Sequence, residues 1–368
     1  MTTDRLNLLY SLMAQHHLDA LILNPGSTQH YFCGLHLGTM ERPMCLFLVP
    51  GKQSAITLPQ LEANQLPLAS IPLEAFFYGD ITATWQNTFD QASAYVGLKG
   101  GRIGVEPTRM RFLELSYLKA AIPAAEFVSA EDLIAEMRMV KDEEEIANMQ
   151  QAVDIAEKAL TTALPLFKLG MTEKEISSEI GLQLMRAGGE GGSFGAIVSG
   201  GPNSANPHAV PSDRPIQRGD LLVIDYGTFY HGYCSDITRT FAIGDVDTKL
   251  AKIHETTQAA NAAARVFAKP GVRAGDVDLA ARKVIEDAGY GKFFTHRVGH
   301  GIGMEGHEPP YMNSGNDLIL KPGHTFTIEP GIYLPDYGGV RVEDDVVITA
   351  NGCRSLSSLP REMIRICD

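Results

Sequence analysis

The sequence has 368 residues, of which 44% are hydrophobic and 20% are charged. This composition is typical of a globular protein long enough for about two domains, and it excludes disordered, collagen-like and coiled-coil chains. No apolar run reaches the ~18–20 residues that cross a bilayer, so we expect no membrane partner. The 44 acidic residues outnumber the 31 basic ones, and the net charge of −13 argues against nucleic acid as a partner.

The cysteines and the first residues favour a cytoplasmic protein. The chain has five cysteines, an odd number, and no Cys-x-x-Cys pair. This pattern fits a reducing compartment and indicates neither a disulfide framework nor a thiolate zinc site. The first residues lead into a helix with a polar face rather than into the apolar core of a signal peptide.

Residues 1–128 predict a small α/β domain. Apolar side chains recur at helical spacing over residues 6–13. Short apolar runs that predict strands follow at 18–23, 44–49, 54–58 and 102–105. No motif with an evident chemical role occurs in this part.

Residues 129–145 are expected to form a linker helix between two domains. Ser129 followed by Asp132 resembles a capping box, in which the two side chains satisfy each other's backbone amides. Apolar residues over 146–160 continue at helical spacing. The second domain is therefore predicted to span residues 146–368.

The second domain contains an internal repeat at an offset of 101 residues (268 − 167). The turn Phe167–Met171 is echoed by Ala268–Val272, and Gly188 is echoed by Gly289. Each copy predicts a turn, an amphipathic helix and Gly-rich strands. Two copies of this length favour one α/β domain with pseudo-two-fold symmetry and a site between its halves.

Two glycine-rich segments match known motifs but lack their structural context. Gly301–Gly306 matches the dinucleotide fingerprint G-x-G-x-x-G, yet prolines at 309 and 310 forbid the helix that must follow. Gly191–Gly195 matches the nucleophile elbow G-x-S-x-G, yet a helix end precedes it and a strand follows, which is the reverse order. We expect neither a nucleotide site nor a serine hydrolase.

Two acids are predicted to lie on one face of a β-hairpin formed by residues 221–227 and 233–241. A two-residue turn at 231–232 makes Asp225 and Asp236 diagonal neighbours on that face. Two carboxylates so placed repel each other unless they are protonated or bridged by cations. The alternative is two independent acids that face solvent.

Three further residues have comparable settings. Glu329 ends a predicted strand, and Pro330 holds it in the extended region. Glu343 lies on another predicted strand and shares its face with Arg341. His300 lies in a Gly-rich segment whose small residues permit close approach of the backbone.

Four carboxylates and one imidazole form a candidate ligand set for two divalent cations: Asp225, Asp236, His300, Glu329 and Glu343. The four negative charges balance the four positive charges of two such ions. The lack of a thiolate favours Mn, Fe or Co, then Zn, over a structural zinc site. A hydroxide between the two ions would form because metals lower the pKa of water.

The spaced motifs of this region resemble the pita-bread metallopeptidases, namely prolidase (Xaa-Pro dipeptidase), aminopeptidase P and, more distantly, methionine aminopeptidase. The motifs are Asp225-Tyr226-Gly227, Ser235-Asp236-Ile237-Thr238, Gly299-His300-Gly301, His307-Glu308-Pro309-Pro310, Ile328-Glu329-Pro330 and Arg341-Val342-Glu343. Residues 1–128 resemble, more weakly, the creatinase/prolidase N-terminal domain. The resemblance implies an α/β (α+β) fold, in which a smaller creatinase-type N-terminal α/β domain precedes a C-terminal pita-bread domain.

The resemblance implies a role for each member of the ligand set. Asp225 would chelate one metal ion, and Asp236 and Glu343 would bridge both ions. His300 and Glu329 would hold the second ion. Glu329 would also shuttle a proton for the attacking hydroxide.

Further residues are implied to line the site. His208 would contact the substrate, and His307 would stabilise the tetrahedral intermediate. His296 and Arg341 would complete the lining. Thr238 and its neighbour Arg239 either orient the carboxylates or serve strand packing.

The resemblance implies an enzyme that hydrolyses Xaa-Pro bonds in peptides with proline at P1′. It implies two divalent ions per subunit and a homodimer, and it favours a prolidase over aminopeptidase P. A non-catalytic binding protein and a metal-independent creatinase are alternatives on the same fold, but both lose ligand positions that this sequence keeps. Methionine aminopeptidase is disfavoured because it lacks the N-terminal domain.

Overall fold

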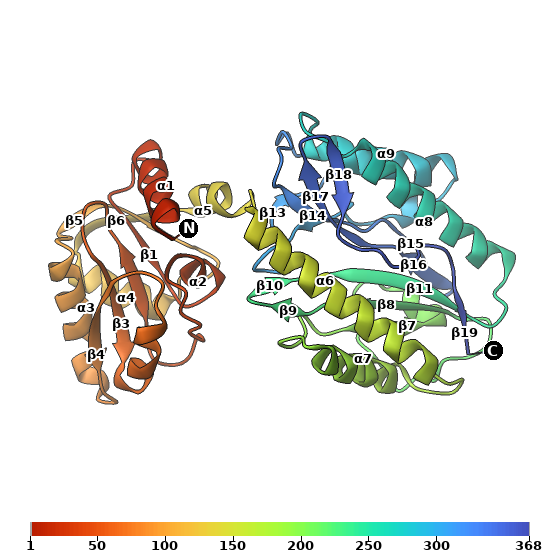
Figure 1. Cartoon of the computed structure of the whole chain (residues 1–368), viewed down its shortest axis with the longest axis horizontal. Helices are drawn as coiled ribbons and strands as arrows, with labels where there is room; N and C mark the ends of the chain where they lie inside the picture. Colours follow the sequence, from red (N-terminus) through yellow and green to blue (C-terminus); the bar gives the residue numbers. More distant parts are fainter. Residues whose placement is uncertain (1, 368) are drawn as a thin grey trace. The chain divides into compact units, whose positions relative to one another are not determined.

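The computed structural model describes residues 2–367, and contacts within the chain divide it into two compact units after Met137 (Figure 1). Unit 1 ends at Met137, and unit 2 starts at Arg138. None of the helices in the described residues is both long and apolar enough to cross a bilayer.

Unit 1 is built on one mixed six-stranded sheet with the order β4-β3-β2-β1-β5-β6. Its strands are β1 (Ala20–Leu23), β2 (Cys45–Leu48), β3 (Ser54–Pro59), β4 (Leu73–Tyr78), β5 (Gly100–Val105) and β6 (Ala124–Ser129). Its helices are α1 (Thr2–Gln15), α2 (Ser27–Cys33), α3 (Trp85–Tyr95) and α4 (Phe112–Ala121), with 3-10 turns at Gln60–Leu68 and Thr82–Thr84. Alternate residues of β1, such as Ala20 and Ile22, pack with Phe89 of α3 and Leu118 of α4 in its core.

The chain between the units does not form the single helix that we expected over 129–145. Helix α5 (Glu131–Arg138) ends early, and helix α6 begins at Glu143. Between them, Val140 pairs with His324 in an isolated β-bridge, which holds this stretch out of helical conformation. A capping box forms at Asp142, whose side chain accepts from the backbone amide of Glu145. The Ser129 hydroxyl instead accepts from the backbone amide of Glu131.

Unit 2 has two helix pairs and two main sheets. Its helices are α6 (Glu143–Ala163), α7 (Glu173–Ala187), α8 (Thr248–Phe267) and α9 (Ala274–Asp287), with 3-10 turns at Leu164–Leu166, Gly201–Ala205 and Gly291–Phe293. The sheet order β19-β11-β8-β7 joins Arg365–Ile366, Ile237–Ile243, Leu221–Tyr226 and Ile197–Gly200. The sheet order β13-β12-β14-β17-β18 joins Glu308–Tyr311, His300–Gly301, Thr325–Ile328, Asp344–Thr349 and Gly352–Ser355. Two-stranded ribbons pair β9 (Phe229–Tyr230) with β10 (Tyr233–Cys234), and β15 (Gly331–Leu334) with β16 (Gly338–Arg341).

The two halves of unit 2 repeat the same local structure. Helices α7 and α9 start 101 residues apart (274 − 173), and each follows a glycine with positive φ, Gly170 or Gly271. The amides of these glycines donate to backbone carbonyls later in the chain, at Ile216 and Leu320 respectively. Helix α6 packs on α7, and α8 packs on α9. The expected pseudo-two-fold repeat is therefore confirmed.

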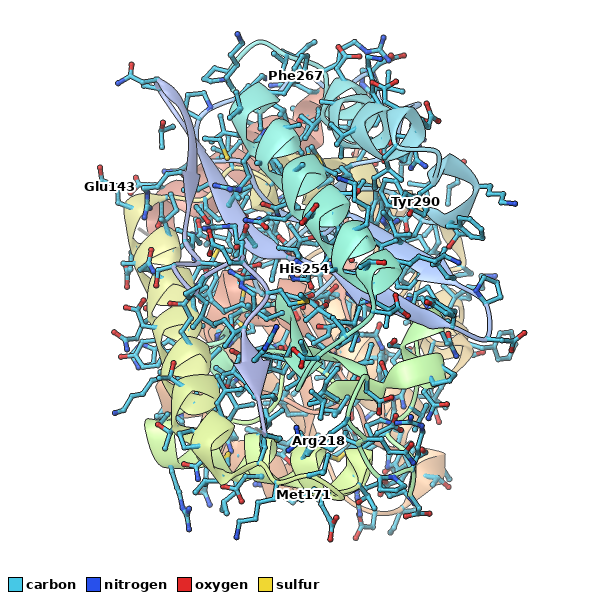
Figure 2. The ribbon with its side chains drawn as sticks, turned by 90° about the vertical axis from the view of Figure 1, so that its right-hand side faces the viewer. Glu143, Met171, Arg218, His254, Phe267 and Tyr290 are labelled. Carbon is cyan, nitrogen blue, oxygen red and sulfur yellow. The ribbon has the colours of Figure 1, made fainter. Side chains whose placement is uncertain are left out.

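Apolar burial in the second half fixes the strands that carry its acids. Helix α8 contacts β14, β15 and β16, and Figure 2 shows it in front of these strands, ending at Phe267. Its buried face shares one core with Phe326, Ile328, Val340 and Val342. Because side chains alternate along a strand, burial of these residues places their neighbours on the opposite face, toward the site.

Candidate metal centre

The hairpin of β8 and β11 has the register that the sequence predicted. Tyr230 pairs with Tyr233, and Asp225 pairs with Thr238. His231 and Gly232 both have positive φ, as a two-residue turn between twisted strands requires. Asp225 and Asp236 are both buried.

A glycine lets the two strands approach closely beside the acids. A Cβ atom at Gly227 would lie 1.9 Å from the carbonyl oxygen of Ser235 and 2.4 Å from Ser193 Oγ. No side chain fits there, so Gly227 is required by the close approach rather than by its own dihedral angles. Ser193 donates its hydroxyl to the Ser235 carbonyl, which makes it a structural residue of this turn.

The second half supplies the other three members of the set. His300 lies on β12, and Glu329 follows β14 directly. Glu343 stands between β16 and β17, next to Asp344, which pairs with Ile328 in the sheet. Each half of unit 2 thus contributes two carboxylates, and the second half adds the imidazole.

The structure brings the five predicted ligands together in two groups of three. In the first group, Asp225, Asp236 and Glu343 each offer an oxygen within 4.8 Å of the others. In the second group, His300, Glu329 and Glu343 do the same. Glu343 is common to both groups. A third group joins His307 to Asp236 and His300.

Two buried oxygen atoms of this cluster lack hydrogen-bond partners among the described residues. They are Asp225 Oδ1 and Asp236 Oδ1. A buried carboxylate oxygen without a partner is costly, whereas a cation would satisfy it. The donor set therefore fits divalent metal ions.

The electrostatics of the cluster indicate missing positive charge. Burial, followed by the charges of nearby carboxylates, raises the pKa of both Asp236 and Glu343 well above the ordinary values. Burial also raises the pKa of Glu329 to about 8, with Arg341 opposing and Asp225 adding to the shift. Burial lowers the pKa of His300 to about 3, so its ring is neutral and free to act as a ligand. Cations in the site would offset the repulsion that raises the pKa values of these carboxyl groups.

Hydrogen bonds hold the carboxylates in place. The Arg341 guanidinium donates to Asp225 Oδ2 at 2.5 Å and to Thr238 Oγ1 at 3.1 Å. Thr238 in turn donates to Glu343 Oε2 at 2.5 Å. Arg239 donates to the backbone carbonyl of Glu343 and is buried. These contacts orient the acids, as expected for one of the two interpretations of Thr238 and Arg239.

Tyr333 is a member of this network that sequence reasoning missed. Its hydroxyl lies 3.0 Å from His296 Nε2 and accepts from Arg341 at 2.9 Å. The Nδ1 atom of His296 lies 2.7 Å from the carbonyl of Arg297, which assigns the proton to Nδ1 and lets Nε2 accept from Tyr333. The sequence offered one sign of this role: Tyr333 lies on β15, only four residues after Glu329 of the Ile328-Glu329-Pro330 motif.

The cluster lies in a cavity of about 500 Å³. All nine predicted site residues line it: His208, Asp225, Asp236, His296, His300, His307, Glu329, Arg341 and Glu343. Four lining residues were not predicted: Phe194, Ile197, Pro207 and Arg297. The His307 ring stacks on the His300 ring at 3.7 Å between centroids. His208 is exposed, whereas His296 is half-buried.

The two glycine-rich segments lack the secondary structure that a nucleophile elbow or a dinucleotide fingerprint needs, as their flanking residues predicted. Helix α7 ends at Ala187 before Gly191–Gly195, and β7 follows it. No helix begins on Gly301–Gly306, which leads from β12 into β13.

Comparisons with known proteins agree with this architecture. The model of metallopeptidase family M24 matches residues 147–350, and that of the creatinase/prolidase N-terminal domain matches residues 5–140. The chain is 34% identical to the Xaa-Pro dipeptidase of Pyrococcus horikoshii, over 98% of this chain and 99% of that protein. The solved structure of a dipeptidase from Pyrococcus horikoshii OT3 matches with a TM-score of 0.93 and 38% identity, over 98% of this chain and 100% of that one.

A solved X-Pro aminopeptidase from Thermotoga maritima matches with a TM-score of 0.87 and 31% identity, over 98% of this chain and 99% of that one. These matches confirm the resemblance and the two-part fold expected from the sequence. The chain therefore belongs to metallopeptidase family M24, with a creatinase/prolidase N-terminal domain before its catalytic part.

Proposed function

We propose that this metallopeptidase is a dinuclear exopeptidase that hydrolyses Xaa-Pro bonds, and specifically an Xaa-Pro dipeptidase. The observation that carries the proposal is the pair of donor groups that share Glu343 in one cavity. The choice of bond is supported by the Pyrococcus horikoshii relative named Xaa-Pro dipeptidase, which aligns with this chain nearly end to end.

Five residues would hold two divalent cations in the proposed enzyme. Asp225 would bind one ion, His300 and Glu329 would bind the other, and Asp236 and Glu343 would bridge both. Bound ions supply a water of lowered pKa and polarise the scissile carbonyl. The oxygen-rich donor set favours Mn²⁺, ahead of Co²⁺, Fe²⁺ and Zn²⁺.

The side chains around the cluster would move protons and stabilise charge. Glu329 lines the cavity, with Oε1 3.4 Å from His300 Nε2. It would take the proton of the attacking water and return it to the proline nitrogen, which leaves as a secondary amine. His307 would donate to the carbonyl oxygen as that atom gains negative charge.

The remaining predicted residues would bind and orient. His208 lines the cavity with an exposed ring and would contact the peptide. Arg341 holds Asp225 and is itself held by Tyr333, which also contacts His296. This chain of contacts would keep the Asp225 carboxylate in the orientation that binds metal.

An Xaa-Pro aminopeptidase is the second candidate, because the Thermotoga maritima X-Pro aminopeptidase has nearly the same fold over the full chain. A non-catalytic binding protein is disfavoured because every donor of the two groups is in place.

The decisive assay uses metal-stripped protein with Mn²⁺ restored, and it compares Ala-Pro with Ala-Pro-Ala-Ala. Cleavage of Ala-Pro alone is expected of a dipeptidase, whereas release of alanine from the longer peptide identifies an aminopeptidase. Asp236→Asn should abolish cleavage. As a matched control, Asp220→Asn removes an acid that pairs with Arg214 at 2.7 Å and does not line the cavity. If neither peptide is cleaved while Mn²⁺ binds, the proposed substrate is wrong.

We also propose that the enzyme is a cytoplasmic homodimer with peptide substrates as its partners. No disulfide links the five cysteines, all of which lie among the described residues, and this is compatible with a reducing compartment. Light scattering coupled to gel filtration tests the dimer, since a mass of one chain would contradict it.

A further inference from the structure

Glu308 is buried next to the site, and the proposed mechanism does not use it. Its side chain is 4% exposed, and two basic side chains contact it. Arg138 Nη2 lies 2.5 Å from one carboxylate oxygen, and Lys141 Nζ lies 2.7 Å from the other. Burial alone would raise the pKa of Glu308, but Lys141 and Arg138 bring it below its ordinary value. The carboxylate therefore stays charged at neutral pH.

The Glu308 side chain is also held by the chain around it. The backbone amide of Glu305 is directed at Glu308 Oε2, at 3.4 Å. A Cβ atom at Gly303 would lie 2.6 Å from Glu308 Oε1 and 2.7 Å from Lys141 Cε. The turn from 303 to 307 is therefore packed directly against this ion cluster, and a larger residue at 303 would have to displace the Glu308 or Lys141 side chain.

The same turn is tied to the acids of the first half. The carbonyl of Gly303 accepts from the backbone amide of Cys234, at 2.7 Å. Cys234 is two residues before Asp236. The ion cluster thus packs against a turn that is hydrogen-bonded to the segment leading into Asp236.

His307 immediately precedes Glu308 at the start of β13. His307 lies in the bend that leads into this strand. The side chain of Glu308 enters the buried ion cluster, whereas His307 lines the cavity and stacks on His300 at 3.7 Å. Fixing the first side chain therefore fixes the direction of the second.

We infer that Glu308 is a positioning residue: clamped by Arg138 and Lys141, it sets the place of His307 above His300. This inference rests on the proposed function, in which His307 stabilises charge on the substrate. Side chains that act in catalysis need support that holds them within a fraction of an ångström. The Arg138–Lys141–Glu308 cluster supplies that support from residues that never reach the cavity.

The test is a double-mutant cycle between Glu308→Gln and His307→Ala, measured as kcat and KM on Ala-Pro. Glu308→Gln alone should lower kcat about 10–100-fold, with KM changed less than about threefold. In the His307→Ala background the same change should cost less than about twofold, because the residue it positions is gone. Asp220→Asn is the matched control, and it should have the same effect in both backgrounds. An equal loss of kcat from Glu308→Gln in both backgrounds overturns the inference.

Crystal structures of the wild type and Glu308→Gln supply a readout that does not depend on the substrate. The inference requires His307 to leave its stacked position on His300 in the variant. If the stack remains at its wild-type distance, the inference is wrong even if Ala-Pro is cleaved. If the wild type cleaves no Xaa-Pro bond, the proposed function fails while this structural result still decides the positioning role.

A milder variant keeps the test open if Glu308→Gln does not fold. Lys141→Met removes one of the two cations and leaves Glu308 paired with Arg138. It should displace His307 less and lower kcat by a smaller factor, again only when His307 is present. An unchanged His307 position in folded Lys141→Met, together with full kcat, overturns the inference.

Discussion

Replacing Glu329 by glutamine should make the metal-free protein more stable, and the gain should grow with pH. The pKa of Glu329 is raised by burial from its ordinary value of 4.5 to about 8. A carboxyl group whose folded pKa is raised contributes stability that is fully present below pH 4.5. That stability is lost as the pH rises through 8. Glutamine does not ionise, so the variant does not lose this stability as the pH rises.

The size of the effect follows from these two values. Between pH 4.5 and pH 8, each pH unit costs about 1.4 kcal/mol of unfolding free energy. Between pH 5 and pH 7, the stability of the variant relative to the wild type should therefore rise by about 2–3 kcal/mol. Buried histidines that do not contact Glu329 titrate alike in both proteins and cancel in the difference. The loss of the Glu329 charge also relieves Asp236 and Glu343, whose pKa values it helps to raise, and this acts in the same direction.

The assay is urea denaturation in EDTA at pH 5, 6 and 7, followed by circular dichroism. The single tryptophan provides an internal reference, because Trp85 lies on α3 of unit 1 and its fluorescence reports that unit. The fluorescence transition should be the same in both proteins. Glu144→Gln, which changes an exposed acid at the start of α6 that does not line the cavity, is the matched control. A stability difference between Glu329→Gln and wild type that is flat or shrinks from pH 5 to pH 7 refutes the reasoning.

Three further changes test other parts of the centre. Thr238→Val removes the hydroxyl that orients Glu343 and should weaken Mn²⁺ binding about 10–100-fold. Calorimetry measures this affinity, and an unchanged affinity would contradict the orienting role of Thr238. Tyr333→Phe deletes a hydrogen bond to Arg341 and should lower kcat on Ala-Pro by about tenfold, while equal kcat would show that Arg341 is held without it. Gly227→Ala places a methyl group against the backbone of the opposite strand and should lower the free energy of unfolding by about 3 kcal/mol or more. A melting temperature within a few degrees of that of the wild type would contradict the observed packing.

Sequence reasoning predicted the parts of the centre that depend on local pattern. The register of the hairpin follows from strand alternation and a two-residue turn, so the facing of Asp225 and Thr238 was predictable. The settings of His300, Glu329 and Glu343 and the balance of four carboxylates against two divalent ions joined these residues to the two acids as one candidate set, and the family resemblance then gave each a role. Their roles remain predictions until the variants are measured.

Other features depend on contacts between distant residues and escaped the sequence. The interruption of the expected linker helix results from Val140 pairing with His324, about half the chain away. The place of Tyr333 between His296 and Arg341 depends on how a ribbon packs beside a loop. Lys141 lies in the expected linker stretch and gave no sign of burial, yet its side chain is 1% exposed and pairs with Glu308 at 2.7 Å. Pattern analysis scores each segment alone and so misses partners supplied by another segment.

The sharing of acids between the two halves of unit 2 makes the two proposed metal positions unequal. The group of His300, Glu329 and Glu343 lies wholly in the second half, after α8. The group of Asp225, Asp236 and Glu343 exists only when the halves are docked. An ion held by Asp225, Asp236 and Glu343 would therefore cross-link the halves through two carboxylates of the first half, whereas its neighbour would reach the first half only through the bridging Asp236. Such a cross-link is worth about 2.7 kcal/mol of docking energy when the ion's concentration is 100 times its dissociation constant. Loosening the contact between the halves, even far from the cavity, should release the ion at Asp225 first.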